Sequence, residues 1–273
     1  MTNKTSFFYL LLLVAFHVYG VEDADFDGVD DAIDKCPNTP FSDLADAYGC
    51  TTSSLYTPTS YDIIMGLNLS SMNANTLENT KTSNATLQAD IYHGNFSAQF
   101  LTSYFKSQDS TYSDSGWNDS QINLFYLFKP TTEFMLQAGV GVIAPTYSTG
   151  YSNEAADYLA SLSLQYSLDK NINLFGGYNY TIVNDDDVGN FLNYQNTNAF
   201  YAGIRYLGNK NKSVSLSYTN AQSIYSGVNP IETLSVGVMV PLDSHWFLLG
   251  DYRYGISDSA SDHEAAVRIG YAF

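Results

Sequence analysis

Aspartates at alternating positions near the N-terminus are the residues best placed to do chemistry. In the stretch "DADFDGVDDAIDKCPNTP", counted from Asp23, carboxylates stand at positions 1, 3, 5, 9 and 12, and a glycine stands at position 6. Calcium takes about six to eight oxygen ligands, and a glycine at that position lets the chain turn sharply enough for them to converge. The alternative is a solvated acidic linker. The predicted calcium ligands are Asp23, Asp25, Asp27, Val29 (through its backbone carbonyl), Asp31 and Asp34.

The same stretch and its continuation resemble a known family. The pattern Asp-x-Asp-x-Asp-Gly-x-x-Asp-x-x-Asp-x-Cys-Pro resembles the thrombospondin type 3 repeat, and "CPNTPFSDLADAYGC" is similar to the form found in OmpA-like bacterial envelope proteins. The resemblance covers residues 23–50. It implies bound Ca²⁺ on the ligands above and a disulfide between Cys36 and Cys50. These are the only two cysteines, and an oxidising compartment favours joining them.

The N-terminus and the overall charge bound the class of protein. Residues 1–20 combine Lys4 with an apolar run from Phe7 to Phe16, which is too short to span a bilayer. This pattern predicts a secretory signal peptide, and the alternative is a buried apolar segment. A formal net charge of −17 argues against a nucleic-acid partner, whose phosphates need a basic surface.

Strand-type alternation dominates the sequence from Tyr61 onward. In "YLASLSLQYSLD", for example, alanine, leucine and tyrosine alternate with serine and glutamine, which predicts strands with one apolar and one polar face. No helical stretch competes with this pattern. Twelve strands are expected, at residues 61–72, 85–95, 96–108, 120–130, 133–147, 158–169, 172–184, 199–208, 212–224, 233–243, 245–257 and 263–273.

The connections between these strands alternate between short and long, which is typical of a transmembrane β-barrel. The apolar strand faces need lipid or a second layer, and the chain offers no helices to cover them. The last strand ends in Phe273 and resembles the C-terminal signature of bacterial outer-membrane barrels. The predicted fold class is therefore all-β, a twelve-stranded antiparallel transmembrane barrel preceded by a small calcium-binding module. The alternative is a soluble β-sandwich or secreted barrel.

Five ionisable residues fall on the polar faces of the expected strands. In a channel such charges set the ion preference, and in a narrow lumen they pair with one another. Arg268 and Asp251, on neighbouring strands, are the expected cross-strand partners. An outer-membrane phospholipase would need a Ser–His pair, and His263 with Ser261 is the one pair at suitable spacing. The predicted lumen charges are Asp90, Arg205, Asp251, Arg253 and Arg268.

The predicted organisation is a signal peptide at 1–20, a calcium module at 21–50, a linker at 51–60 and a barrel at 61–273. The leading interpretation is a porin-like channel for small solutes in the lipid of a Gram-negative outer membrane, without enzymatic activity. Its calcium module is expected in the periplasm, in contact with peptidoglycan or another envelope protein. The alternatives are a non-conducting structural or adhesive barrel that acts through calcium and, third, an outer-membrane phospholipase.

Overall fold

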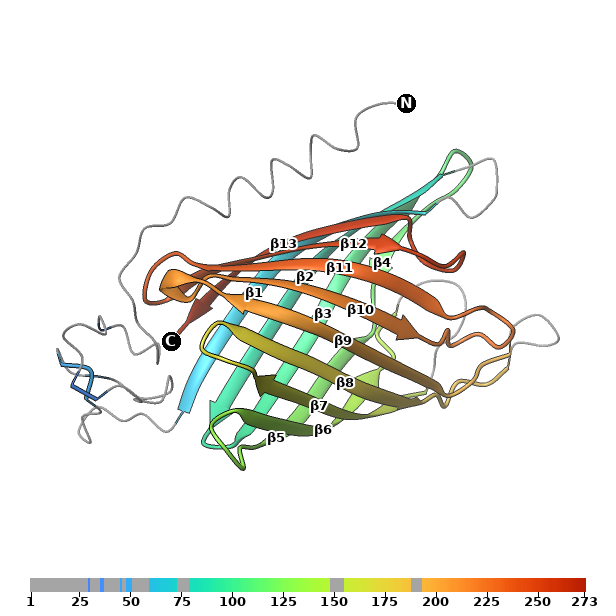
Figure 1. The fold of residues 1–273 in the computed structure, drawn as a ribbon. Helices are drawn as coiled ribbons and strands as arrows, with labels where there is room; N and C mark the ends of the chain where they lie inside the picture. The colour runs from blue at the N-terminus through green and yellow to red at the C-terminus, as the bar shows by residue number, and fades with distance from the viewer. Residues whose placement is uncertain are drawn as a thin grey trace. The chain divides into compact units, whose positions relative to one another are not determined.

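The computed structural model describes residues 29, 35–36, 45, 48–50, 59–72, 79–147, 155–187 and 193–273. The larger of two compact units, residues 57–207 and 212–273, is a single antiparallel sheet (Figure 1). Among the described residues, no helix is long and apolar enough to cross a membrane. The strands are β1 Thr59–Met72, β2 Thr80–His93, β3 Phe96–Gln108, β4 Ser113–Trp117, β5 Ser120–Phe128, β6 Phe134–Ala144, β7 Asp157–Ser167, β8 Ile172–Ile182, β9 Thr197–Leu207, β10 Ser213–Ala221, β11 Ile231–Pro241, β12 Trp246–Gly255 and β13 His263–Ala272.

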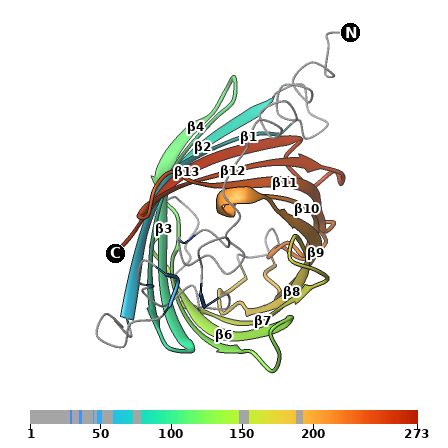
Figure 2. The same cartoon turned by 60° about the vertical axis from the view of Figure 1, so that its left-hand side comes forward.

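The sheet closes on itself because its first and last strands pair. β1 and β13 are antiparallel neighbours from Asp62 opposite Ala272 to Ser71 opposite His263. β2 pairs with both β1 and β3, which completes the ring visible in Figure 2. Among the described strands, each except the short β4 therefore has a neighbour on both sides, as a β-structure in lipid requires. The closed antiparallel barrel expected from the sequence is thus confirmed.

Thirteen strand segments occupy twelve positions, because β4 and β5 both pair with β3. β5 pairs with β3 as far as Gln121 opposite Leu101, and β4 pairs with it from Trp117 opposite Tyr104. Three residues on one side therefore face two on the other, which is a β-bulge. Residues 113–117, expected to lie in the connection at 109–119, form β4, and β2 begins at Thr80 rather than at residue 85; these two expectations were wrong. The alternation continues past the expected strand ends, and the bulge merely interrupts it.

The two faces of the barrel differ as the alternation predicts. Outward side chains are large and apolar and remain exposed, such as Leu67 at 63% and Val267 at 58%. Buried apolar residues among those described are few and include Ile64 and Phe105. A soluble protein rarely exposes so continuous an apolar surface. Lipid is therefore the medium that this surface fits.

Glycines on inward positions make room for large side chains on the next strand. In each case the glycine lies directly opposite its partner, and a Cβ at the glycine would collide with it. This arrangement lets bulky groups lie flat along the inner wall instead of crossing the lumen. The pairs are Gly66 with Arg268, Gly139 with Phe125, Gly177 with Tyr201, Gly203 with Phe175, and Gly270 with Phe247.

Short turns connect the strands at one end of the barrel, and their aspartates stabilise them. The Oδ1 atom of Asp169 accepts backbone N–H bonds from Asn171 and Ile172, at 2.7 and 2.8 Å. The Oδ1 atom of Asp243 likewise accepts the backbone N–H groups of His245 and of Trp246, the first residue of β12. Such bonds replace the backbone partners that a tight turn leaves unmade. They set the length of each turn and so the register of the hairpin.

Candidate functional site: the inward face of the barrel

A hydrogen-bonded cluster of polar side chains surrounds Asp90 on the inner wall. Asp90 is 4% exposed, and its two carboxylate oxygens accept bonds from Gln88 Nε2 (2.6 Å) and Gln99 Nε2 (2.9 Å). The side-chain oxygen of Gln99 accepts in turn from Asn123 Nδ2, at 3.2 Å. Residues of β2, β3 and β5 are thereby joined at one level. A buried carboxylate held by two amide donors is satisfied, so it can remain at this position.

Asp62 is an inward carboxylate that the sequence analysis missed. It lies directly opposite Asp90 on the paired strand β1, so two carboxylates neighbour one another on the lumen side. Leu67 and Leu69 face outward on β1, so the alternation along the strand could have predicted that Asp62 faces inward. Two like charges at one level attract cations to this part of the inner wall.

Arg253 bridges two acidic residues further along the wall. Its guanidinium lies 3.3 Å from Asp251 Oδ1 on the same strand and 2.8 Å from Glu264 Oε1 on β13. The expected pair of Asp251 with Arg268 was wrong, because Asp251 and Arg268 are not opposite one another. Asp251 lies opposite Ala266, and Arg268 lies opposite Leu249. Glu264, which the sequence analysis did not consider, takes the cross-strand role.

The other two inward arginines have different surroundings. Arg205 lies over the ring of Phe175, with 5.2 Å between the guanidinium carbon and the ring centroid. Arg268 lies against Gly66, and its Nε atom is buried without a hydrogen-bond partner. A stacked or partly unpartnered guanidinium keeps its charge available to passing ions.

The inward strand positions therefore carry charges of both signs, with carboxylates in excess. The guanidinium groups are those of Arg205, Arg253 and Arg268, and the carboxylates are those of Asp62, Asp90, Asp114, Asp157, Asp251 and Glu264. Six negative charges less three positive charges leave three excess negative charges. The five charges predicted from the sequence are among these nine, and their part in ion preference stays a prediction.

The long connections at the other end of the barrel are acidic. Asp157 Oδ1 accepts the backbone N–H of Asn184 at 2.8 Å. In the connection after β8, burial raises the pKa of Asp185, and the nearby carboxylates of Asp157, Asp119 and Asp186 raise it further. One carboxylate oxygen of Asp185 is buried without a hydrogen-bond partner. This connection therefore concentrates negative charge that its own surroundings do not neutralise.

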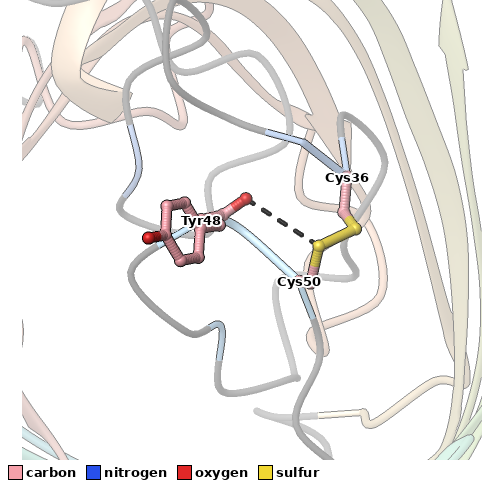
Figure 3. Close-up of a disulfide and its surroundings, with 3 residues drawn as sticks. All are labelled: Cys36, Tyr48 and Cys50. Atoms are coloured by element: carbon pink, nitrogen blue, oxygen red, sulfur yellow. Dashed lines mark hydrogen bonds between the residues drawn. A yellow bond between two sulfur atoms is a disulfide. The ribbon is translucent and has the colours of Figure 1, made fainter.

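The predicted disulfide between Cys36 and Cys50 is present, with 5.0 Å between the two Cα atoms (Figure 3). Tyr48 lies beside it. Its carbonyl oxygen accepts the backbone N–H of Lys35, and its ring lies 3.8 Å from the Lys35 ammonium. The same carbonyl lies 3.9 Å from Cys50 Sγ, a van der Waals contact since a disulfide sulfur carries no hydrogen.

The predicted calcium site lies almost entirely outside the described residues. Val29 is described, whereas Asp23, Asp25, Asp27, Asp31 and Asp34 are not. The ligand set therefore stays a prediction.

The His263–Ser261 pair of the phospholipase alternative can be compared with the structure. His263 is the first residue of β13, and its Nδ1 atom lies 2.7 Å from the hydroxyl of Tyr252. The outward ring thus contacts a tyrosine on the neighbouring strand instead of the serine two residues before it. This contact occupies Nδ1, whereas a serine nucleophile pairs with Nε2 in the Ser–His–Asp arrangement.

Comparison with solved structures decides the fold type. No protein-family model matches the chain, and no curated protein matches it. The outer membrane channel COG4313 from Pseudomonas putida F1 is similar, with a TM-score of 0.61 and 12% identity over 79% of this chain and 95% of that one. The NanC porin matches with a TM-score of 0.51 and 14% identity, over 78% of this chain and 98% of that one.

The fold is that of an outer-membrane β-barrel. A third similar structure, the KdgM porin, has a TM-score of 0.50 and 13% identity over 78% of this chain and 99% of that one. In each case the comparison covers nearly the whole of the known protein. The likeness is one of backbone architecture, because so little sequence is shared.

Proposed function

We propose that the chain is an outer-membrane channel of a Gram-negative cell that passes small polar solutes. The observation that carries the proposal is the contrast between the two faces of one closed barrel. The outer face is apolar and exposed, whereas the inner face carries amides, hydroxyls and nine charged side chains of both signs. An apolar exterior suits lipid, and a polar interior suits water and solutes.

The names of the three similar proteins support this proposal. One is called an outer membrane channel and two are called porins. Twelve strand positions also suit a modest lumen, since the diameter of a barrel grows with its strand number. Passage by small solutes is the function that fits such a lumen.

The calcium module is proposed to have a structural role in the periplasm. Twelve strand positions return the chain to the side from which it entered, which is also the side of the short turns. In outer-membrane barrels the short turns face the periplasm. A disulfide and an ion are the means by which so small an exported module holds its fold. Peptidoglycan or another envelope protein is its proposed partner.

Planar-bilayer recording tests the channel function. Purified full-length protein, added to a bilayer in potassium chloride, is expected to produce stepwise current increases of uniform size. Heat-denatured protein is the control and is expected to give none. Folded protein that inserts without conducting would contradict the proposal and favour the non-conducting envelope barrel. A lipid-hydrolysis signal that disappears in His263→Ala would instead support the phospholipase.

A further inference from the structure

A polar cavity lies on the inner wall where the first strands approach the long connections. Its volume is about 560 Å³, within the range of roughly 300–1,000 Å³ typical of small-molecule sites. Its walls come from β1, β2, β3 and β4, which run side by side in Figure 1, and from three connections. Of the nine inward charged residues, only Asp114 lines it.

The cavity is lined by groups that both donate and accept hydrogen bonds. Of its eleven described lining residues, seven are asparagine, serine or threonine, three are aromatic, and Asp114 is the only one with a charge. Amides and hydroxyls match the hydroxyl groups of an uncharged ligand in either direction. An anionic ligand would need an arginine or lysine, and Asp114 would repel it.

One row of residues crosses the back of the cavity at a single level. Asn68 on β1 lies opposite Asn84 on β2, and Asn84 lies opposite Phe105 on β3. Phe105 lies opposite Gly116 on β4, whose lack of a side chain keeps the end of the row open. Two amides and an aromatic ring therefore stand next to one another on a rigid sheet, which is how specific sites are held in place.

The amide of Asn68 has an acceptor to spare. Its Nδ2 atom must face Glu264, because a carboxylate only accepts, and the two atoms lie 2.6 Å apart. This bond fixes the amide and leaves its Oδ1 atom buried with no hydrogen-bond partner. A buried acceptor without a partner costs free energy until a donor reaches it. A ligand hydroxyl is such a donor.

A second amide is held from the opposite side. The Nδ2 atom of Asn118 donates to Ser103 Oγ at 2.8 Å and to Asn84 Oδ1 at 3.3 Å. Its backbone N–H also donates to the Ser103 carbonyl, at 2.9 Å. The bulge between β4 and β5 thus orients Asn118 toward the cavity. Bulges commonly re-aim a side chain next to a functional site.

The aromatic side of the cavity is equally ordered. The rings of Phe105 and Tyr147 are stacked, with centroids 5.6 Å apart and planes 8° apart. Tyr147 is held by its backbone N–H, which donates to Asp119 Oδ1 at 2.9 Å. The phenol of Tyr112 donates a hydrogen bond to Asp114 Oδ2 at 2.7 Å, so one carboxylate oxygen of Asp114 already has a partner. Flat rings beside amides suit a ligand with one C–H face and several hydroxyls.

We propose that this cavity binds an uncharged, polyhydroxylated solute of the class of neutral mono- and disaccharides. The proposal rests on the proposed channel function, for which it names a solute class and an entry site. The C–H face of a sugar ring would lie on the exposed ring of Tyr147, which stacks on the buried ring of Phe105. Its hydroxyls would donate to the Oδ1 atom of Asn68 and exchange bonds with Asn84 and Asn118. A uronic acid of the same size would be rejected by Asp114.

Calorimetry on the folded full-length protein in detergent tests the site without reference to conduction. Glucose, maltose and cellobiose are the probes, and galacturonate is the charged comparison. At least one neutral sugar is expected to bind, with galacturonate at least tenfold weaker. Asn84→Leu and Tyr147→Ala are each expected to weaken that binding at least tenfold. The matched control is Asn179→Leu on β8, an inward asparagine outside the cavity, which is expected to bind as the native protein does.

Several outcomes would overturn the proposal. These are the absence of binding by all three neutral sugars, equal affinity for galacturonate, or unchanged affinity in both cavity variants. Using two variants at different walls keeps the test valid if one fails to fold, which circular dichroism detects. Bilayer currents separate the two proposals. Conduction without sugar binding contradicts the site alone, whereas sugar binding without conduction contradicts the channel and supports the site.

Discussion

Arg268 lies directly opposite Gly66 on the neighbouring strand, and its side chain occupies the space that a Cβ at position 66 would need. The backbone carbonyl oxygen of Val267 is also close, 2.9 Å from the position of such a Cβ. A side chain at position 66 must therefore displace the Arg268 side chain. This pair couples a backbone requirement on β1 to the position of a lumen charge on β13.

Replacing Gly66 with alanine is expected to destabilise the barrel by about 1–3 kcal/mol, the usual cost of overpacking. The urea midpoint of refolded protein in lipid vesicles measures this change. Gly250→Ala is the matched control, because the nearest atom to a Cβ there is 4.0 Å away. A Gly66→Ala variant as stable as Gly250→Ala would show that Arg268 yields without cost.

The excess of inward carboxylates predicts a channel that prefers cations. Reversal potentials in a potassium chloride gradient measure the preference. Replacing both Asp62 and Asp90 with asparagine changes the count from six carboxylates against three arginines to four against three. We therefore expect the double variant to prefer cations less strongly than the native channel does, since charges on the lumen wall set ion preference.

Glu232→Gln is the control for this experiment. Glu232 accepts a hydrogen bond from Asn220 at 2.8 Å and has the parity of the outward residues of β11. The Glu232→Gln substitution therefore removes a charge that lies outside the lumen. Its reversal potential should equal that of the native channel. An unchanged preference in the Asp62/Asp90 variant would place the selective charges elsewhere.

The acidic connections predict opposite pH effects at two aspartates. The pKa of Asp185 is raised by burial and by the neighbouring carboxylates of Asp157, Asp119 and Asp186. Its ionisation is therefore harder in the folded state, and the free energy of unfolding falls as pH rises from the ordinary pKa of 3.8 through the raised one. Asp185→Asn should raise the urea midpoint at pH 7, and the gain should vanish below the ordinary pKa, where both side chains are neutral.

Asp109 gives the reverse comparison in the connection after β3. Backbone N–H bonds from Thr111 and Tyr112 lower its pKa, so it stabilises the folded chain above the ordinary value and loses that effect as pH falls through the lowered one. Asp109→Asn should therefore lower the urea midpoint at pH 7. Shifts of the same sign in both variants would contradict this account of the two carboxyl groups.

The calcium module predicts a loss of binding in Asp27→Ala. Asp27 stands at the fifth position of the loop, immediately before the glycine, and its removal takes away one carboxylate ligand. Calorimetry with calcium chloride is expected to show at least a tenfold weaker affinity. Asp46→Ala, outside the ligand spacing, should bind as the native protein does. Equal affinities in the two variants would refute the loop assignment.

Much of the barrel was predictable because lipid outside and water inside require apolar and polar residues to alternate along each strand. Leu162 and Leu164 had to alternate with Ser161 and Ser163 once one face met lipid and the other met water. The type of each residue therefore predicted which face of the sheet its side chain takes. The disulfide was equally predictable, since Cys36 and Cys50 had no other partner.

The sequence by itself determined which face each strand residue takes, because strand parity is a local property of the chain. Only the tertiary structure decided which residues meet across strands, because register depends on turn lengths and on the bulge at residues 118–120. In the observed register Arg268 stands two positions from the residue opposite Asp251, and Glu264 lies opposite Arg253. The cavity before Phe105 and Tyr147 has the same origin, since its walls come from strands and connections whose approach no single segment specifies.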